Sequence, residues 1–385
     1  MTEQTDLWPQ VRLARVLSPI DRSMPSSELA EINIAGVFSF GRGLFKRGPL
    51  LPSETSYKSY NRLHTDDFVI SQPKAWEGAL GRVPAELEGW YLSPVFPTFR
   101  CDASALDPRY LEWFCRRRAV WIELQSKAKG LGARRETVSV DQFLTVEIPL
   151  PPLPEQQSIV ARIDEVAKQL DHAQFLQATV ATEAEELCRA LLRDTETVAT
   201  PLREVVSLRA PDVRVQADLS YHFAGVYSFG RGVFVGNTKS GTEFAYPRLT
   251  RLRAGDFVYP KLMAWEGAFG IVPPECDGLV VSTEFPVFEV NRDRVLPAVL
   301  DVHFRNPALW TSIGGASTGT NVRRRRLNPQ DFLDLELPLP SMERQRLLAK
   351  AYEDVHAVKA RQSESRAMLQ ALLPAILDRA FAGAL

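Results

Sequence analysis

The sequence Gly-Val-Phe-Ser-Phe-Gly-Arg-Gly at residues 36–43 returns as Gly-Val-Tyr-Ser-Phe-Gly-Arg-Gly at residues 225–232, an offset of 189 positions. The same offset, without a gap, relates Asp67-Phe68-Val69 to Asp256-Phe257-Val258 and Ala75-Trp76-Glu77-Gly78-Ala79 to Ala264-Trp265-Glu266-Gly267-Ala268. A repeat of this length differs from the 20–50-residue period of a solenoid, whose units cannot fold alone. The sequence therefore predicts two folded domains built on one plan.

Length and composition agree with two domains. A chain of 385 residues with 45% hydrophobic residues can supply two cores of roughly 140 residues each. The N-terminus has no basic segment followed by an apolar one, and no run of about 18 apolar residues occurs, so we expect neither export nor membrane insertion. Four cysteines without a C-x-x-C pair argue against a zinc site or a disulfide framework and favour a reducing cytoplasm. A net charge of −1 means that nucleic-acid binding would depend on local basic patches.

A long helix is predicted after the first copy, because residues 155–193 contain neither Pro nor Gly. At 1.5 Å per residue this helix spans roughly 60 Å. An equivalent segment from Met342 to about Ala382 follows the second copy, and Pro374 is expected to kink or end it. We expect the two helices to pair as an antiparallel coiled coil; the alternative is that each folds back on its own domain. The first helix has a heptad seam with one polar interruption, formed by Ile159, Ile163, Val166, Leu170, Ala173, Gln177, Val180, Ala184, Leu187 and Leu191.

Each globular copy is predicted to be rich in strands. Short apolar stretches at 67–71, 95–99 and 280–285 are bounded by Gly, Pro and charged residues, as strands are. Helices are expected at 108–125 and 295–310. The predicted fold class is α/β (α+β), with two β-rich domains in tandem repeat separated by the two long helices. The expected domain ranges are 1–150 and 199–340 for the two copies, 151–198 for the central helix and 341–385 for the C-terminal helix.

Sequence patterns typical of catalysis are missing. Gly41-Arg42-Gly43 and its repeat are followed by apolar or basic strand-like segments rather than by a helix, which favours a tight turn over a nucleotide loop. No Walker loop, His-Glu-x-x-His, Gly-x-Ser-x-Gly or amino-methyltransferase motif occurs, and none of the five histidines lies within five residues of another, which argues against a metal site. Glu77 and Glu266 lack a second acid or base, so the Trp-Glu pairs are interpreted as structural anchors or as ligand contacts.

Basic residues cluster inside the otherwise neutral copies. Arginine forks bind phosphates or the O6 and N7 atoms of guanine, and loops rich in Gly, Thr and Asn can approach a phosphate backbone closely. If residues 323–326 form a strand, only one alternate pair of their arginines can face a ligand. The alternative is a solvated or salt-bridged charge run, and residues 116–118 are expected to face solvent or acidic neighbours. The candidate DNA-binding residues are Arg42, Lys46, Arg47, Lys74, Arg134, Arg135, Arg231, Lys239, Lys261, Thr320, Asn321, Arg323, Arg324 and Arg325.

The order of these motifs resembles the specificity (S) subunit of type I restriction-modification systems. The resemblance covers almost the whole chain. Its most diagnostic piece is Pro149-Leu150-Pro151-Pro152-Leu153-Pro154-Glu155-Gln156-Gln157, which runs into Ile159, Val160 and Ile163 after a β-rich domain. The second copy departs from this pattern because Arg344 stands where the first copy has Glu155, whereas Gln345 corresponds to Gln156.

The resemblance implies a non-catalytic DNA-binding subunit. In this family two target-recognition domains, held apart by the coiled coil, each read one half of a bipartite DNA sequence. Methyltransferase (M) subunits, expected in two copies, carry the S-adenosylmethionine site, and restriction motor subunits join where cleavage occurs; no cofactor is expected on this chain. The implied setting is phage defence in a bacterial or archaeal cytoplasm, near the nucleoid.

Two further observations bear on this hypothesis. Residues 44–62 and 233–251 share little, and neither do residues 126–133 and 315–322. Domains that read different half-sites would diverge in this way, although tolerant surface loops would too. The alternatives are a specificity factor of another phage-defence assembly and a DNA-binding regulator without a methyltransferase.

Overall fold

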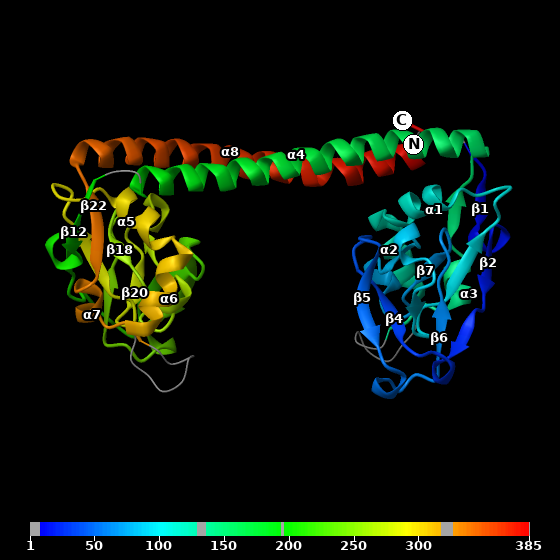
Figure 1. Ribbon diagram of the computed structural model, residues 1–385, viewed down its shortest axis with the longest axis horizontal. Coiled ribbons are helices and arrows are strands. Elements are labelled where there is room, and N and C mark those ends of the chain that lie inside the picture. Colours follow the sequence, from blue (N-terminus) through cyan, green and yellow to red (C-terminus); the bar gives the residue numbers. More distant parts are fainter. Residues whose placement is uncertain (1–7, 129–135, 194–195, 317–325, 385) are drawn as a thin grey trace. The chain divides into compact units, whose positions relative to one another are not determined.

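The chain folds into two compact units, each built around one copy of the repeat. The computed structural model describes residues 8–128, 136–193, 196–316 and 326–384 (Figure 1). Unit 1 comprises Met1–Phe175 and Glu364–Leu385, and unit 2 comprises Leu176–Ser363. Each unit therefore contains one β-rich copy together with a part of each long helix. None of the described helices is long and apolar enough to cross a membrane.

The strands of unit 1 form three sheets within the described residues. The largest has the order β3-β6-β9-β4-β5, so β5 is an edge strand, and the others have the orders β2-β10-β7-β8 and β1-β11. The expected strand at 95–99 begins only at Thr98, because Pro97 has no N–H for a ladder. The bounds are β1 Gln10–Arg12, β2 Leu17–Ile20, β3 Ser23–Pro25, β4 Ile32–Val37, β5 Leu44–Leu50, β6 Ser59–Arg62, β7 Phe68–Ile70, β8 Leu80–Arg82, β9 Tyr91–Leu92, β10 Thr98–Cys101 and β11 Glu147–Pro149.

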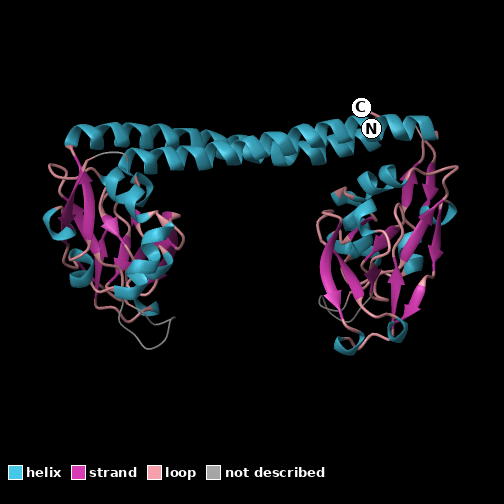
Figure 2. Ribbon diagram, viewed as in Figure 1, coloured by secondary structure: helices cyan, strands magenta, loops and turns pink. Residues whose placement is uncertain are grey.

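Unit 2 repeats these sheets. Its described strands have the orders β14-β17-β20-β15-β16, β13-β21-β18-β19 and β12-β22, which match the first copy strand for strand. Figure 2 shows the strands of each unit together with short helices. The bounds are β12 Thr197–Pro201, β13 Val206–Leu208, β14 Val213–Arg214, β15 Ser220–Tyr227, β16 Gly232–Ser240, β17 Arg248–Arg251, β18 Phe257–Val258, β19 Gly270–Ile271, β20 Val280–Ser282, β21 Val287–Val290 and β22 Glu336–Pro340.

The single helix expected in each copy is two helices. In unit 2, α5 (Pro297–Phe304) ends before Pro307, which begins α6 (Pro307–Ala316) and cannot continue the preceding helix. In unit 1, Arg117 is extended between α1 (Pro108–Cys115) and α2 (Arg118–Lys127). The other short helices are α3 Val140–Leu144 and α7 Pro329–Leu333, with 3-10 turns η1 Leu13–Arg15, η2 Ser26–Glu28, η3 Pro52–Glu54, η4 Ala75–Glu77, η5 Ala85–Leu87, η6 Leu202–Glu204, η7 Gly241–Glu243, η8 Ala264–Glu266 and η9 Pro274–Cys276.

The two long helices are α4 (Leu153–Arg193) and α8 (Met342–Phe381), and they pair antiparallel in both units. In unit 1, Ile163 near the start of α4 packs in one core with Leu377 near the end of α8. In unit 2, Leu192 packs with Leu348, and Glu185 pairs with Lys359. Of the two effects expected of Pro374, a kink or an end, the end is contradicted, because α8 continues through Pro374 to Phe381.

The predicted heptad seam describes only the first part of α4. Ile159 and Ile163 are buried, whereas Val180 and Leu187 are exposed and the neighbouring Cys188 is buried. An α-helix with 3.6 residues per turn drifts by about 20° per heptad from a strict 3.5-residue repeat. Over several heptads this drift moves the buried face by about one position, which is the shift observed.

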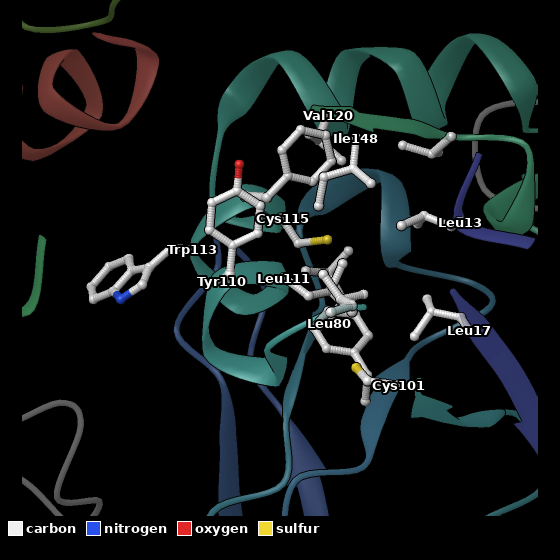
Figure 3. Packing of buried hydrophobic residues seen from close by; sticks show 14 of the residues in the cluster. Leu13, Leu17, Leu80, Cys101, Tyr110, Leu111, Trp113, Cys115, Val120 and Ile148 are labelled. Atoms are coloured by element: carbon white, nitrogen blue, oxygen red, sulfur yellow. The ribbon is translucent and has the colours of Figure 1, made fainter. Parts of the chain in front are cut away.

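The core of unit 1 lies between the four-stranded sheet, the short helices and the long helices. Figure 3 shows Leu13 and Leu17 pointing toward the interior occupied by Leu80, Leu111 and Cys115. The corresponding core of unit 2 includes a group of contacting rings around Phe332, and it combines α5 with the ends of both long helices. Each Å² of apolar surface removed from water stabilises the fold by roughly 25 cal/mol. The burial of these side chains is therefore the main force that holds each copy against the long helices.

A buried glutamine joins each proline-rich strand to its long helix. The side chain of Gln156 donates to the carbonyls of Ala105 (2.8 Å) and Pro151 (2.9 Å) and accepts from the N–H of Asp107 (2.9 Å). Gln345 repeats this pattern, donating to Arg294 and Pro340 and accepting from Leu296. The most diagnostic motif of the sequence is therefore a structural clamp that fixes the helix to the globular copy.

Candidate nucleic-acid interface

Two repeated motifs meet at the turn between β4 and β5 in unit 1. Phe40 and Gly41 both have positive φ, at 64° each. The N–H of Phe40 donates to the carbonyl of Glu77 (2.8 Å), and the N–H of Gly41 donates to that of Gly78 (2.9 Å). The hydroxyl of Ser39 also donates to the Glu77 carboxylate (3.3 Å). The glycine-rich turn and the Trp-Glu-Gly motif are thus one structure, and Glu77 has a structural role in it.

The turn between β15 and β16 in unit 2 has the same geometry. Phe229 has a φ of 63°, and its N–H donates to the carbonyl of Glu266 at 2.8 Å. The hydroxyl of Ser228 donates to the Glu266 carboxylate at 3.0 Å. A phenylalanine with positive φ is strained, and it persists only where surrounding contacts hold it. Phe40 and Phe229 are each 65% exposed, so core packing does not explain why an aromatic residue occupies either position.

Each turn carries a stack of one arginine on two aromatic rings. In unit 1 the Arg42 guanidinium lies 4.6 Å from the centre of the Phe38 ring, which stacks on Phe45 at 3.9 Å. In unit 2 Arg231 lies 4.6 Å from the centre of Tyr227, which stacks on Phe234 at 3.9 Å. We call these two groups the arginine–aromatic stacks.

The guanidinium groups of the stacks are fixed but not neutralised. Arg42 Nε donates to the Ser39 carbonyl (3.1 Å), and Arg231 Nε donates to the Ser228 carbonyl (3.2 Å). Among the described residues, neither guanidinium forms an ion pair with a carboxylate. The terminal nitrogens can therefore bind an anion in a fixed orientation, as a two-pronged donor suited to phosphate.

A groove on the five-stranded sheet of unit 1 begins where the stack ends. It has a volume of about 670 Å³ and is lined by strand β5 and by the segment between η3 and β6, with Gly36, Phe45, Arg47, Ser56, Tyr57 and Tyr60 among its residues. The Phe45 ring lies so close to Gly36 that a Cβ atom there would be 2.4 Å from it. The stack and the groove therefore form one continuous surface.

The other predicted basic residues differ in how free their charges are. Lys74 pairs with Glu77 at 2.6 Å, so its charge is largely used within the protein. Lys46 lies 5.3 Å from the centre of the Trp90 ring, whereas Arg47 and Lys239 are exposed. The main chain of Lys261 bonds to Glu284 and Leu327, and it is Met263, not Lys261, that occupies the repeat position of Lys74.

Half of the predicted residues lie outside the described part of the chain. They are Arg134, Arg135, Thr320, Asn321, Arg323, Arg324 and Arg325. Arg326, the last of the four consecutive arginines, forms an ion pair with Glu284. Trp76 is a half-buried anchor whose Nε1 donates to the Pro73 carbonyl at 3.1 Å.

The candidate residues predicted from sequence do not include the exposed Phe40 and Phe229 of the turns. They also do not include Ser56 and Tyr57, which line the groove. The identity of Ser-Phe-Gly-Arg-Gly in both copies was an available signal for the first pair. No sequence signal marks the second pair, because the groove exists only once β5 and β6 lie in the same sheet.

Comparison with solved structures identifies the fold of the chain, whereas comparison of sequences finds no match. No family model matches the chain, and no curated protein matches it in sequence. The crystal structure of the HsdS subunit from Thermoanaerobacter tengcongensis is similar over 98% of this chain and 97% of that chain, with 20% identity and a TM-score of 0.52.

Two further solved structures are similar over the whole chain. One, described as showing complex assembly and conformational transition of the type I R-M system, covers 98% of both chains with 20% identity and a TM-score of 0.66. The other, the type I restriction-modification system S subunit from M. genitalium, covers 100% of this chain and 98% of that chain with 12% identity and a TM-score of 0.51. The chain therefore has the fold of type I S subunits from end to end.

Proposed function

We propose that this chain is the non-catalytic DNA-recognition subunit of a type I restriction-modification complex, and that each unit reads one half of a bipartite target. The observation that carries the proposal is internal to the chain. The arginine–aromatic stack is the same in both units, whereas the strand that leaves it differs in sequence. The DNA backbone is the same at every site, whereas the base sequence differs between half-sites. A protein that recognises both needs one surface that is the same in its two domains and one that differs.

The constant surface suits the phosphate backbone. Phosphates are the same at every base pair, so the residues that bind them can be the same in both units. Arg42 and Arg231 are unpaired within the described residues and are fixed by Nε, so little side-chain entropy is lost when the terminal nitrogens bind. We assign these two residues to phosphate contacts that position each unit on the duplex.

Chemistry is assigned to partners. In this proposal methyltransferase subunits supply S-adenosylmethionine and extrude the target adenine, because an enzyme that modifies a base must take it out of the stack. Restriction motor subunits join in the systems that cleave. The role of the present chain is to bind DNA and present the target.

Single-molecule sequencing of adenine methylation in the host genome, with and without this gene, tests the proposal. We expect the loss of one motif made of two short specified blocks separated by a fixed gap. An unchanged methylome in cells that express the protein would contradict the proposal and favour another defence or regulatory assembly. Deletion of the methyltransferase gene whose product co-purifies with this chain is the control, because it should remove the same motif.

A further inference from the structure

The strand that follows the constant turn differs in sequence between the two units. β5 and β16 occupy the same edge position in the two five-stranded sheets. β4 pairs antiparallel with β5 as the edge hairpin of its sheet (Figure 1), and we call this hairpin the ribbon. Residues 47–50 read Arg-Gly-Pro-Leu, and the equivalent residues 236–239 read Gly-Asn-Thr-Lys. In contrast, Gly36, Phe45 and Tyr57 recur as Gly225, Phe234 and Tyr246, so the framework around the strand is kept.

Arg47 occupies a special position on β5. Ile34 pairs with Gly48 and Ala35 pairs with Lys46, so Arg47 is the extra residue of a β-bulge. A bulge redirects a side chain away from the regular alternation of the strand. Arg47 is exposed, lines the groove and has neither a hydrogen bond nor an ion pair with any described residue. Its guanidinium is available to a ligand.

The groove around Arg47 supplies further polar groups. Ser56 is exposed, and its hydroxyl bonds to none of the described residues. Tyr57 is 42% exposed, packs edge-on against Tyr60 and has a free hydroxyl within the described part. In unit 2 the position of Arg47 is Gly236 and that of Ser56 is Ala245, so the second unit lacks both groups. Its free polar side chains lie further along the strand, at Asn237, Thr238 and Lys239.

From these observations we infer that β5 and β16 are the strands that read base edges, and that Arg47 contacts a guanine in the half-site of unit 1. This inference rests on the proposed function. The major groove of B-DNA admits a two-stranded ribbon, and an arginine bidentate to O6 and N7 of guanine is the commonest specific contact there. By the same rule Asn237 contacts an adenine in the half-site of unit 2.

The adjoining stack makes this arrangement possible. Arg42 lies on Phe38, and Phe38 lies on Phe45, whose ring forms the near wall of the groove. A phosphate held by Arg42 therefore fixes the height and direction from which β5 approaches the bases. The constant contact positions the strand, and the variable residues on the strand select the sequence.

Binding selection with the complete complex tests the inference. The full chain and its methyltransferase partner are incubated with duplexes that are randomised one position at a time across both half-sites. We expect Arg47→Ala to reduce the preference for guanine at one position by about 5- to 150-fold, and to leave the other half-site unchanged. Arg47→Gln should shift that position toward adenine, which a merely misfolded variant would not do.

Two further variants sharpen the result. Arg15→Ala removes an equal charge from an exposed residue in η1, outside the ribbon, and should change neither half-site. Asn237→Ala should relax one adenine position in the half-site that Arg47→Ala leaves intact.

Three outcomes would overturn the inference. A uniform loss of affinity for all sequences with a shallower salt dependence would make Arg47 a phosphate contact. Unchanged specificity with new self-association would mean that the charges of β5 only protect a sheet edge. Unchanged specificity and unchanged solubility would leave Arg47 no role in recognition. If the unmodified complex itself shows no bipartite preference, it is the proposed function that fails.

Discussion

The turn at residues 38–43 and the strand at residues 44–50 are adjacent in unit 1. The turn is nearly the same in unit 2, whereas the strand differs in sequence. The turn keeps its hydrogen bonds, its strained phenylalanine and its stacked arginine in both units. The strand keeps its place at the sheet edge and changes its residues. This difference separates positions constrained by a common partner from positions free to select different sequences. Matched substitutions, one in each unit, test whether equivalent residues have the same role in the two units.

The largest expected effect is at the glutamine clamp. Gln156→Leu removes three hydrogen bonds and leaves buried backbone groups unpaired, so we expect unit 1 to lose about 2–4 kcal/mol of stability. Gln345→Leu should cost unit 2 the same. Urea unfolding followed by hydrogen exchange of peptides from each unit measures both losses. The neighbouring Gln157 is exposed, and Gln157→Leu should change stability little; an equal loss there would refute the clamp.

A somewhat smaller effect is expected where a glycine touches a tryptophan. Gly78 and Gly267 have positive φ, and a Cβ atom would lie 2.5 Å from Trp121 or 2.2 Å from Trp310. We expect Gly78→Ala and Gly267→Ala each to cost about 2–3 kcal/mol, of which about 1 kcal/mol is backbone strain.

Matched glycines separate the two causes. Gly89 and Gly278 have nearly the same φ, but neither is crowded by a large side chain. Gly89→Ala and Gly278→Ala should therefore show the strain alone in thermal unfolding. Equal losses for all four variants would mean that the tryptophan contacts do not constrain the turns.

The third effect concerns DNA affinity. Arg42→Ala and Arg231→Ala should each weaken binding by about 1 kcal/mol for every sequence, and should lower the slope of log affinity against log salt by about 1. Titration of labelled duplex with the complex at several salt concentrations measures both quantities. Different results for the two variants would break the equivalence of the stacks. Arg15→Ala, at an exposed residue of unit 1 outside the groove and the stack, is the charge-matched control.

The smallest effect is a pH dependence of unit 2 that comes from one histidine. Burial lowers the pKa of His303 to about 4, whereas the equivalent residue of unit 1 is Phe114. The unfolded chain binds a proton near pH 6.5 and the folded chain does not, so stability falls as the pH drops from about 6.5 toward 4. We expect a loss on the order of 1 kcal/mol between pH 7 and 5.

Exchanging the two residues tests the sign of this effect. His303→Phe should flatten the pH dependence of unit 2, as measured by hydrogen exchange at pH 7 and 5, and Phe114→His should introduce one in unit 1. A pH response of unit 2 that survives His303→Phe would assign it to other groups. One such group is His356, whose pKa is also lowered by burial.

The sequence by itself determined the repeat, the two long helices and the resemblance to S subunits. These features depend on patterns that a chain carries along its length: the constant offset between copies, the absence of Pro and Gly from 155–193, and the proline run before it. Residues such as Arg42 and Arg231 were also identifiable, because a basic residue fixed in two copies of a turn is a local signal. Such features depend on residues that are close together in the sequence, so sequence patterns alone can predict them.

Only the tertiary structure decided which residues meet. Ser39 and Glu77 are far apart in sequence and bond because β4 and η4 pack together, and Arg47 is a free guanidinium because the ladder skips it. Cys188 near the end of α4 is buried in the core of the second copy, although the helix directly follows the first copy in sequence. Such outcomes depend on contacts between distant segments, which no local pattern specifies.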